Sequence, residues 1–223
     1  MSHKVHPYIF RIGQVTNWRS RWFNLKEYAS LVKEDVLVRK FLEGKLKDIG
    51  LEKLEIERTV NSVNVMIFVS RPGLLIGRGG EGIEKLKDEI MKFFRKNFPK
   101  KKKFDLKLTV EEVKNPDASA QLVSQNIAAE LERRMPFRRL MKQKIEKAMS
   151  NKDVKGIKIA MNGRLDGAEI ARSEWLKQGR IPLQTLRANI EFGKATAFTT
   201  YGTVGIKVWI YKGEVFEKEK SDK

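Results

Sequence analysis

Apolar and polar positions between residues 34 and 114 follow one another in an order typical of a small α+β domain. Apolar residues spaced three and four apart predict two helices, over 34–46 and 83–98. Apolar residues that alternate with polar ones predict three strands, at 54–58, 63–69 and 104–110. A short apolar turn and a glycine-rich turn, at 74–76 and 77–82, separate the second strand from the second helix.

The rest of the chain predicts a second domain. Asn115-Pro116-Asp117 has the residue types of a helix start, and we place a domain boundary there. Apolar stripes predict one helix on each side of Pro136, which cannot continue a helix. Further strands are expected, at 157–161, 186–192 and 204–211, and residues 168–177 are expected to be helical.

These patterns predict an α+β protein with two domains, an arm and a tail. The arm covers residues 1–33 and the first domain residues 34–114. The second domain covers residues 115–213, with helices packed on a mixed sheet, and a charged tail covers 214–223. No internal repeat is visible.

The charge balance indicates what kind of partner the protein binds. The 223 residues contain 46 Lys plus Arg against 28 Asp plus Glu, which gives a net charge of +18 and a pI near 10.0. A surplus of this size predicts a polyanionic partner, and nucleic acid fits best because neutralising many phosphates releases counterions. The arm interleaves cations with aromatic residues, which suits either an RNA contact or packing on its own domain.

Composition also excludes several classes of chemistry. Cysteine is absent, so disulfides, thiolate metal sites and cysteine nucleophiles are excluded. With only His3 and His6 present, a zinc site is disfavoured, and we expect neither a metal nor a cofactor. No apolar run of about eighteen residues occurs, so we expect a cytosolic protein rather than a membrane or secreted one.

The turn Gly77-Arg78-Gly79-Gly80 is the strongest candidate for nucleic-acid chemistry. Glycine has no Cβ, so a phosphate can approach the backbone, and the amide groups of the following helix can donate to its oxygens. Gly77, Gly79 and Gly82 also fit a dinucleotide-binding pattern, but that pattern needs a strand directly before the first glycine and an acid about twenty residues later. Neither is present, so we favour the G-x-x-G loop of a KH domain of the prokaryotic type, type II.

A second cluster of cations lies around Pro136. On the helix after it, Arg138, Arg139 and Lys142 fall in one sector while apolar residues fall in another. A cationic sector without acids of its own is suited to contact with phosphates, and Arg133 and Arg134 precede it.

The segment 162–175 brings carboxylates and arginines close in sequence. A nuclease using Asp166, Glu169 and Glu174 with magnesium is one hypothesis, but salt links within a helix explain these residues without a substrate. We therefore expect no enzyme, and we expect the neighbouring glycines to shape turns that present Arg164.

Six motifs occur in the order in which they occur in bacterial-type small-subunit ribosomal protein S3, and the chain resembles that family from Lys4 to Gly213. The motifs are Lys4–Pro7, Leu75–Gly77, Phe137–Arg139, Gly163–Arg172, Gly179–Arg187 and Thr199–Gly202. The family loop usually reads Gly-Lys-Lys-Gly, so this chain, with Gly79 at the third position, lacks the second cation.

The resemblance implies a structural role in the head of the 30S subunit, bound to 16S rRNA beside proteins S10 and S14. It also implies that the positions matching Arg138, Arg139 and Lys142 face incoming mRNA and assist its unwinding. Further candidates for rRNA contact are Lys4, His6, Arg11, Lys100, Lys101, Lys102, Lys103, Arg164, Arg172 and Arg187. A free KH regulator that binds RNA outside the ribosome is the alternative.

Overall fold

The structure, a computed structural model, describes residues 5–59, 61–98 and 104–216, and the chain in it divides into two units. Residues 18–114 form the N-terminal unit. The C-terminal unit combines residues 115–216 with the start of the chain up to Asn17. The residues that we expected to form one arm, 1–33, are therefore divided between the units, and two helices begin inside that range, at Pro7 and at Tyr28.

The N-terminal unit is a four-stranded sheet covered by helices. Its strands are β1 (Ser20–Arg21), β2 (Leu51–Arg58), β3 (Ser62–Val69) and β4 (Asp105–Glu112), in that order across the sheet. The helices are α2 (Tyr28–Lys45), α3 (Pro72–Ile76) and α4 (Glu81–Asn97), with single 3-10 turns η1 (Lys47–Ile49) and η2 (Arg78–Gly80). The β2–β3 pair is antiparallel, whereas β1–β2 and β3–β4 are parallel.

One face of this sheet forms the core of the unit. Along β3, alternate residues from Val63 to Val69 are buried, and they pack with Leu42 of α2 and with Ile90 of α4. The predicted helices and strands are confirmed here, except that α2 begins at Tyr28 rather than at residue 34. Its first turns contain exposed and half-buried residues without an apolar stripe, so periodicity did not reveal them.

A buried ionic group fastens α2 to the sheet. Arg58, at the end of β2, pairs with Glu34 at 2.8 Å and with Asp35 at 2.5 Å, and all three side chains are 5% exposed. The indole nitrogen of Trp22 also donates to Asp35, at 2.8 Å. The aromatic segment before α2 is therefore held against the N-terminal unit by a specific hydrogen bond.

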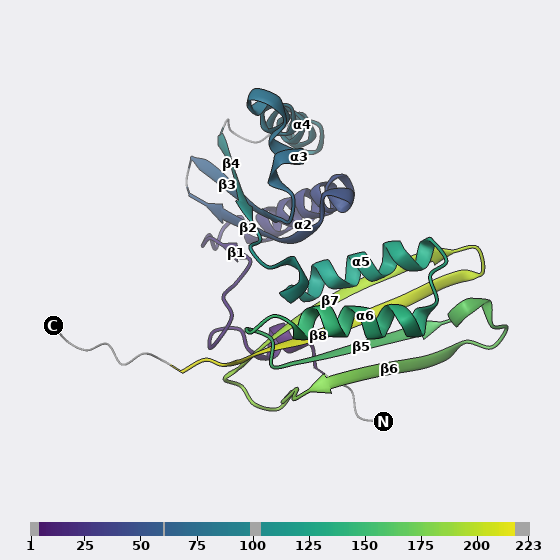
Figure 1. The fold of residues 1–223 in the computed structure, drawn as a ribbon. Helices are drawn as coiled ribbons and strands as arrows, with labels where there is room; N and C mark the ends of the chain where they lie inside the picture. The colour runs from purple at the N-terminus through teal and green to yellow at the C-terminus, as the bar shows by residue number, and fades with distance from the viewer. Residues whose placement is uncertain (1–4, 60, 99–103, 217–223) are drawn as a thin grey trace. The chain divides into compact units, whose positions relative to one another are not determined.

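The C-terminal unit consists of two long helices on an antiparallel sheet (Figure 1). The sheet order is β6-β5-β8-β7, and the strands are β5 (Gly156–Gly163), β6 (Arg172–Gly179), β7 (Ala188–Thr199) and β8 (Gly202–Glu214). The helices are α1 (Pro7–Phe10), α5 (Ala120–Glu132) and α6 (Phe137–Met149), with 3-10 turns η3 (Pro116–Ala118) and η4 (Leu165–Gly167).

The core of this unit lies between the sheet and the pair α5 and α6. Ile127 and Leu140 from the helices are fully buried against Ile159 and Val208 from the strands. Pro136 separates the two helices as predicted, and it stands as the N-cap of α6. The helix expected directly at Asn115 is only the turn η3, and α5 follows it from Ala120.

Two expectations for this unit need correction. Residues 168–177 are not helical, because Arg172–Gly179 form the edge strand β6. Charge spacing suggested a helix there, but only Glu174 and Leu176 of this strand are partly buried, so a strand pattern was hardly visible in the sequence. The sheet is also antiparallel throughout, and the mixed pairing that we expected here occurs in the N-terminal unit. The α+β class is confirmed.

Candidate nucleic-acid interface

The glycine-rich loop joins α3 to α4 in the N-terminal unit. Gly79 and Gly80 have φ values of 62° and 86°, in the left-handed region where a side chain would be strained. The Arg78 side chain is exposed and makes no hydrogen bond or ion pair within the described residues. The loop thus presents a free guanidinium beside the N-terminus of a 17-residue helix. Such a helix end attracts phosphates, and RNA contact at this loop stays a prediction.

Two carboxylates already occupy the first turn of α4. Glu81 and Glu84 lie there, and Glu81 pairs with Lys85 at 2.5 Å. They compete with an incoming phosphate for the positive end of the helix dipole. Arg78 is consequently the main source of attraction at this loop, which agrees with the missing second cation noted in the sequence.

Gly82 has a structural role that we did not assign from the sequence. A Cβ at this position would lie 2.3 Å from the carbonyl oxygen of Leu75 and 2.9 Å from that of Ile76. Both atoms belong to the backbone of α3 and cannot rotate away. Gly82 therefore allows α3 and α4 to approach each other closely. The sequence signal for this role was its position as the third glycine of the pattern that we rejected for dinucleotide binding.

Helix α6 has a buried apolar side and an exposed cationic side. Its buried residues are Phe137, Leu140, Met141, Lys144, Ile145 and Ala148. Arg138, Arg139 and Lys142 are exposed, and neither Arg139 nor Lys142 pairs with a carboxylate within the described residues. The predicted separation of a core side from a cationic side is confirmed, while nucleic-acid binding there stays a prediction.

A carboxylate from β6 reaches this cationic side. Glu174 pairs with Arg138 at 3.3 Å and with Arg172 at 3.1 Å. The hydrogen bond from Arg138 to Glu174, together with the carboxylate charge, raises the pKa of Arg138 above its ordinary value, and Asp166 adds a smaller effect. The Arg138 side chain is nevertheless 69% exposed. An exposed pair is weak, so a phosphate can compete for this guanidinium.

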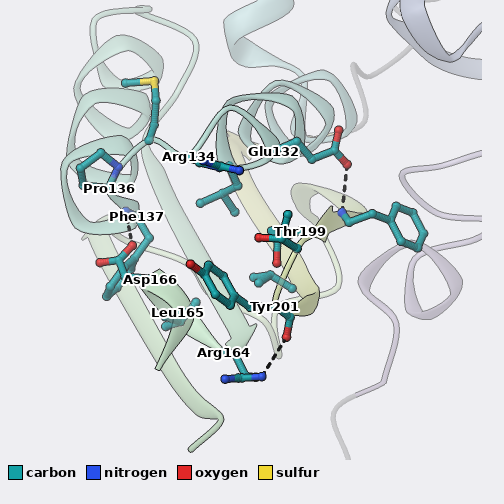
Figure 2. A pocket seen from close by; sticks show the side chains of 15 residues that line it. Glu132, Arg134, Pro136, Phe137, Arg164, Leu165, Asp166, Thr199 and Tyr201 are labelled. Carbon is teal, nitrogen blue, oxygen red and sulfur yellow. Dashed lines mark hydrogen bonds between the residues drawn. The ribbon is translucent and has the colours of Figure 1, made fainter. Parts of the chain in front are cut away.

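The turn between α5 and α6 borders a hollow of about 430 Å³. Figure 2 shows Glu132 and Arg134 beside the end of α5, with Arg164 and Asp166 across the hollow and Tyr201 between them. Arg133 is the C-cap residue of α5 and Arg134 follows it, so neither lies on α6 with the other cations. Both are exposed.

Hydrogen bonds fix the walls of this hollow. Glu132 accepts from the backbone amide of Phe198 at 2.9 Å, and Asp166 accepts from that of Phe137 at 3.5 Å. Arg164 donates to the carbonyl oxygens of Ala168 and Tyr201, at 2.8 and 3.3 Å. We expected the turn to present Arg164 to RNA, but two donors of its guanidinium instead stabilise the turn. Only the remaining donors of Arg164 can contact RNA.

Arg11 is not a surface cation, and its assignment as an rRNA contact is corrected. The residue is 1% exposed. Its guanidinium donates to the carbonyl oxygens of Pro7, Leu183 and Thr185, at 3.0, 2.8 and 2.9 Å. Desolvation by burial lowers the pKa of Arg11 below its ordinary value. This residue ties the start of the chain to the segment before β7.

Three other candidates for rRNA contact remain on the surface. His6 caps α1 by accepting from the amide of Tyr8 at 3.2 Å, and its ring meets that of Phe192 edge to face. Arg187 pairs with Glu214 at 2.6 Å. Arg172 pairs with Glu174, as described above. All three residues are exposed, and their RNA contacts stay predictions. Lys4, Lys100, Lys101, Lys102 and Lys103 lie outside the described residues.

The acids considered for a nuclease do not form a site. Asp166 lies in η4 and Glu174 in β6, where it is paired with two arginines. Within residues 5–59, 61–98 and 104–216, no group of three or more His, Asp or Glu side chains is placed to hold a metal ion. In the same part of the chain, no helix combines the length and the hydropathy needed to cross a bilayer.

Comparisons with known proteins agree with this arrangement. Residues 127–210 match the family model described as ribosomal protein S3, C-terminal domain, and residues 37–118 match that of the KH domain. The small ribosomal subunit protein uS3 of Lawsonia intracellularis is 50% identical over 219 residues, covering 98% of this chain and 99% of that protein. The protein of the same name from Exiguobacterium sibiricum is 47% identical over 221 residues, covering 99% and 98%. The KH domain and the resemblance stated from the sequence are thereby confirmed.

Proposed function

The chain belongs to the ribosomal protein S3 family, and from this premise we propose that it lines the channel through which mRNA enters the small subunit. The family is a structural one rather than an enzymatic one, so the nuclease hypothesis is dropped. As a member, the chain is a constituent of the small ribosomal subunit that binds rRNA and other ribosomal proteins. Contact with mRNA and the neighbours S10 and S14 are parts of the proposal.

The observation that carries the proposal is the cationic side of α6. Arg138, Arg139 and Lys142 project from a helix whose opposite side is fully buried, so their backbone positions are fixed. Two of the three have no carboxylate partner within the described residues, and the third, Arg138, is 69% exposed, so a phosphate can replace Glu174 at it. A rigid row of cations binds the backbone of a single strand without reading its sequence.

The mechanism follows from this geometry. Phosphates of an incoming strand exchange with Glu174 at Arg138 and are neutralised by Arg139 and Lys142. A strand held in this way cannot re-form its hairpin at once, so a base pair that has opened stays open. The force that moves the mRNA comes from translocation by the ribosome. The protein thus assists unwinding by holding single strands, and no nucleotide hydrolysis is involved.

The test is the triple variant Arg138→Ala, Arg139→Ala, Lys142→Ala in reconstituted ribosomes. Translation through a stable hairpin should slow about tenfold, because three phosphate contacts are lost, whereas an unstructured message should be translated at the native rate. The matched control is Lys87→Ala, Lys92→Ala, Arg95→Ala, which removes three exposed cations from α4. An unchanged hairpin rate in the first variant would defeat the proposal.

A further inference from the structure

The face of the C-terminal sheet that points away from α5 and α6 carries cations and aromatic rings. On the helix side the central strands bury their side chains fully, as for Ile157, Ile159 and Ile206. Their neighbours along each strand point the opposite way, since side chains alternate. Strand pairing then places two rows across the four strands: Lys177, Lys158, Trp209, Phe192, and Trp175, Ala160, Lys207, Lys194. We call these two rows the open face.

The open face contains no carboxylate. From 156 to 162, 173 to 179, 190 to 198 and 203 to 211, no residue on this side is acidic. Moreover, Lys207 stands directly opposite Lys194, and neither pairs with a carboxylate within the described residues. Like charges directly opposite each other destabilise a sheet unless an anion lies between them. The arrangement therefore indicates a polyanionic occupant.

One aromatic ring on the open face, that of Trp175, is available for stacking, whereas Phe192 and Trp209 are half-buried. The residue Trp175 is 58% exposed, and its neighbour across the pair is the small Ala160, so space is left beside the ring. The Lys158 ammonium lies 4.7 Å from the Trp175 ring and 5.5 Å from the Trp209 ring. A hollow of about 410 Å³, bordered by Trp175, Lys158, Lys207 and the segment 5–7, lies on this face. Rings and cations are thus interleaved at one concave surface.

From these observations we infer that the open face binds an unpaired segment of rRNA, with a base stacked on Trp175 and phosphates held by Lys158, Lys177, Lys194 and Lys207. An acidic peptide would satisfy the lysines but would leave the exposed indole without a flat partner, whereas every nucleobase has a face that stacks. The inference rests on membership of the small subunit and not on the proposed contact with mRNA. It concerns a surface separate from the cationic side of α6.

The absence of cysteine from the chain allows a direct test. The Ser173→Cys variant places one thiol on the same side of the sheet, two residues before Trp175 and opposite Asn162. An iron–EDTA group tethered there and activated in reconstituted 30S subunits should cleave rRNA close by. The native chain, treated with the same reagent, has no thiol and serves as the control.

Two readouts separate this inference from the proposed function. Normal incorporation of Ser173→Cys into the 30S peak without cleavage of rRNA would overturn the inference. Defective translation through hairpins in the α6 variant concerns the proposed function alone. Either result can be obtained without the other.

Stacking is tested with a pair of substitutions at an exposed position. Trp175→Ala should weaken incorporation into subunits, measured by competition with the native chain, about tenfold. Trp175→Phe keeps an aromatic face and should stay within about twofold of native. Equal incorporation of the two variants would contradict the assignment of Trp175, and their folding is checked by hydrogen exchange of the β5 amides.

Discussion

Arg134 and Asp166 adopt backbone conformations that glycine would adopt more easily. Their φ values are 64° and 53°, and within the described residues they are the two non-glycine residues with positive φ. Both line the hollow of Figure 2. Arg134 follows the C-cap of α5, where the left-handed conformation closes the helix: its amide donates to Leu131, and that of Met135 donates to Glu130. A side chain kept at such a position is expected to have a use beyond folding.

Replacing Arg134 by glycine should therefore stabilise the C-terminal unit. Removal of the Cβ relieves about 1 kcal/mol of left-handed strain. Arg133→Gly is the matched control, because Arg133 has φ −83° and a glycine there only adds freedom to the unfolded chain, lowering stability by about 0.5 kcal/mol. Hydrogen exchange of the α5 amides measures both. If both substitutions changed the stability of the C-terminal unit in the same direction, backbone strain at Arg134 would be excluded.

Predictions for single residues succeeded where the environment of the residue is set by its neighbours in the sequence. The exposure of Arg139 and Lys142 follows from the apolar stripe on their own helix. The partner of Arg138 did not follow, because Glu174 comes from a strand 36 residues later. Arg11 was misassigned for the same reason, since two of its carbonyl partners, Leu183 and Thr185, lie more than 170 residues away.

Among the elements, the close contact of α3 with α4 sets the shape of the glycine-rich loop. These two helices place Gly77 to Gly80 at the surface, and the backbone of α3 lies against Gly82. Elements with a strong apolar stripe, such as α4, were predictable, as was β3 from its alternation. The edge strand β6 was not, because it buries too little for either period to be visible.

Gly82→Ala should accordingly destabilise the N-terminal unit by about 1–3 kcal/mol, since a methyl group would have to displace the backbone of α3. The control is Gly73→Ala in α3, where an added Cβ meets nothing within 4 Å. That change should be neutral or slightly stabilising. Thermal unfolding followed by hydrogen exchange of the α4 amides compares the two. Equal stability of both variants would exclude the close contact.

On the scale of the whole molecule, the first and the last of the described residues belong to the same unit. Residues up to Asn17 belong with 115–216, and residues 18–114 are a continuous insertion between them. Sequence patterns could not predict this, because the first segment lacks periodicity and its partners are distant. The sequence left open whether the arm contacts RNA or packs on its own domain, and the buried guanidinium of Arg11 shows that residues 5–17 pack on the C-terminal unit.

Arg11→Met tests this organisation. Methionine retains much of the buried volume but leaves the carbonyl oxygens of Leu183 and Thr185 without their donor, which should destabilise the C-terminal unit by about 3 kcal/mol. Hydrogen exchange should accelerate in β7 and β8 and stay unchanged in residues 18–114. Arg187→Met is the control, because its exposed pair with Glu214 contributes about 0–1 kcal/mol. Faster exchange in the N-terminal unit, or equal effects of the two variants, would contradict the assignment of the first segment to the C-terminal unit.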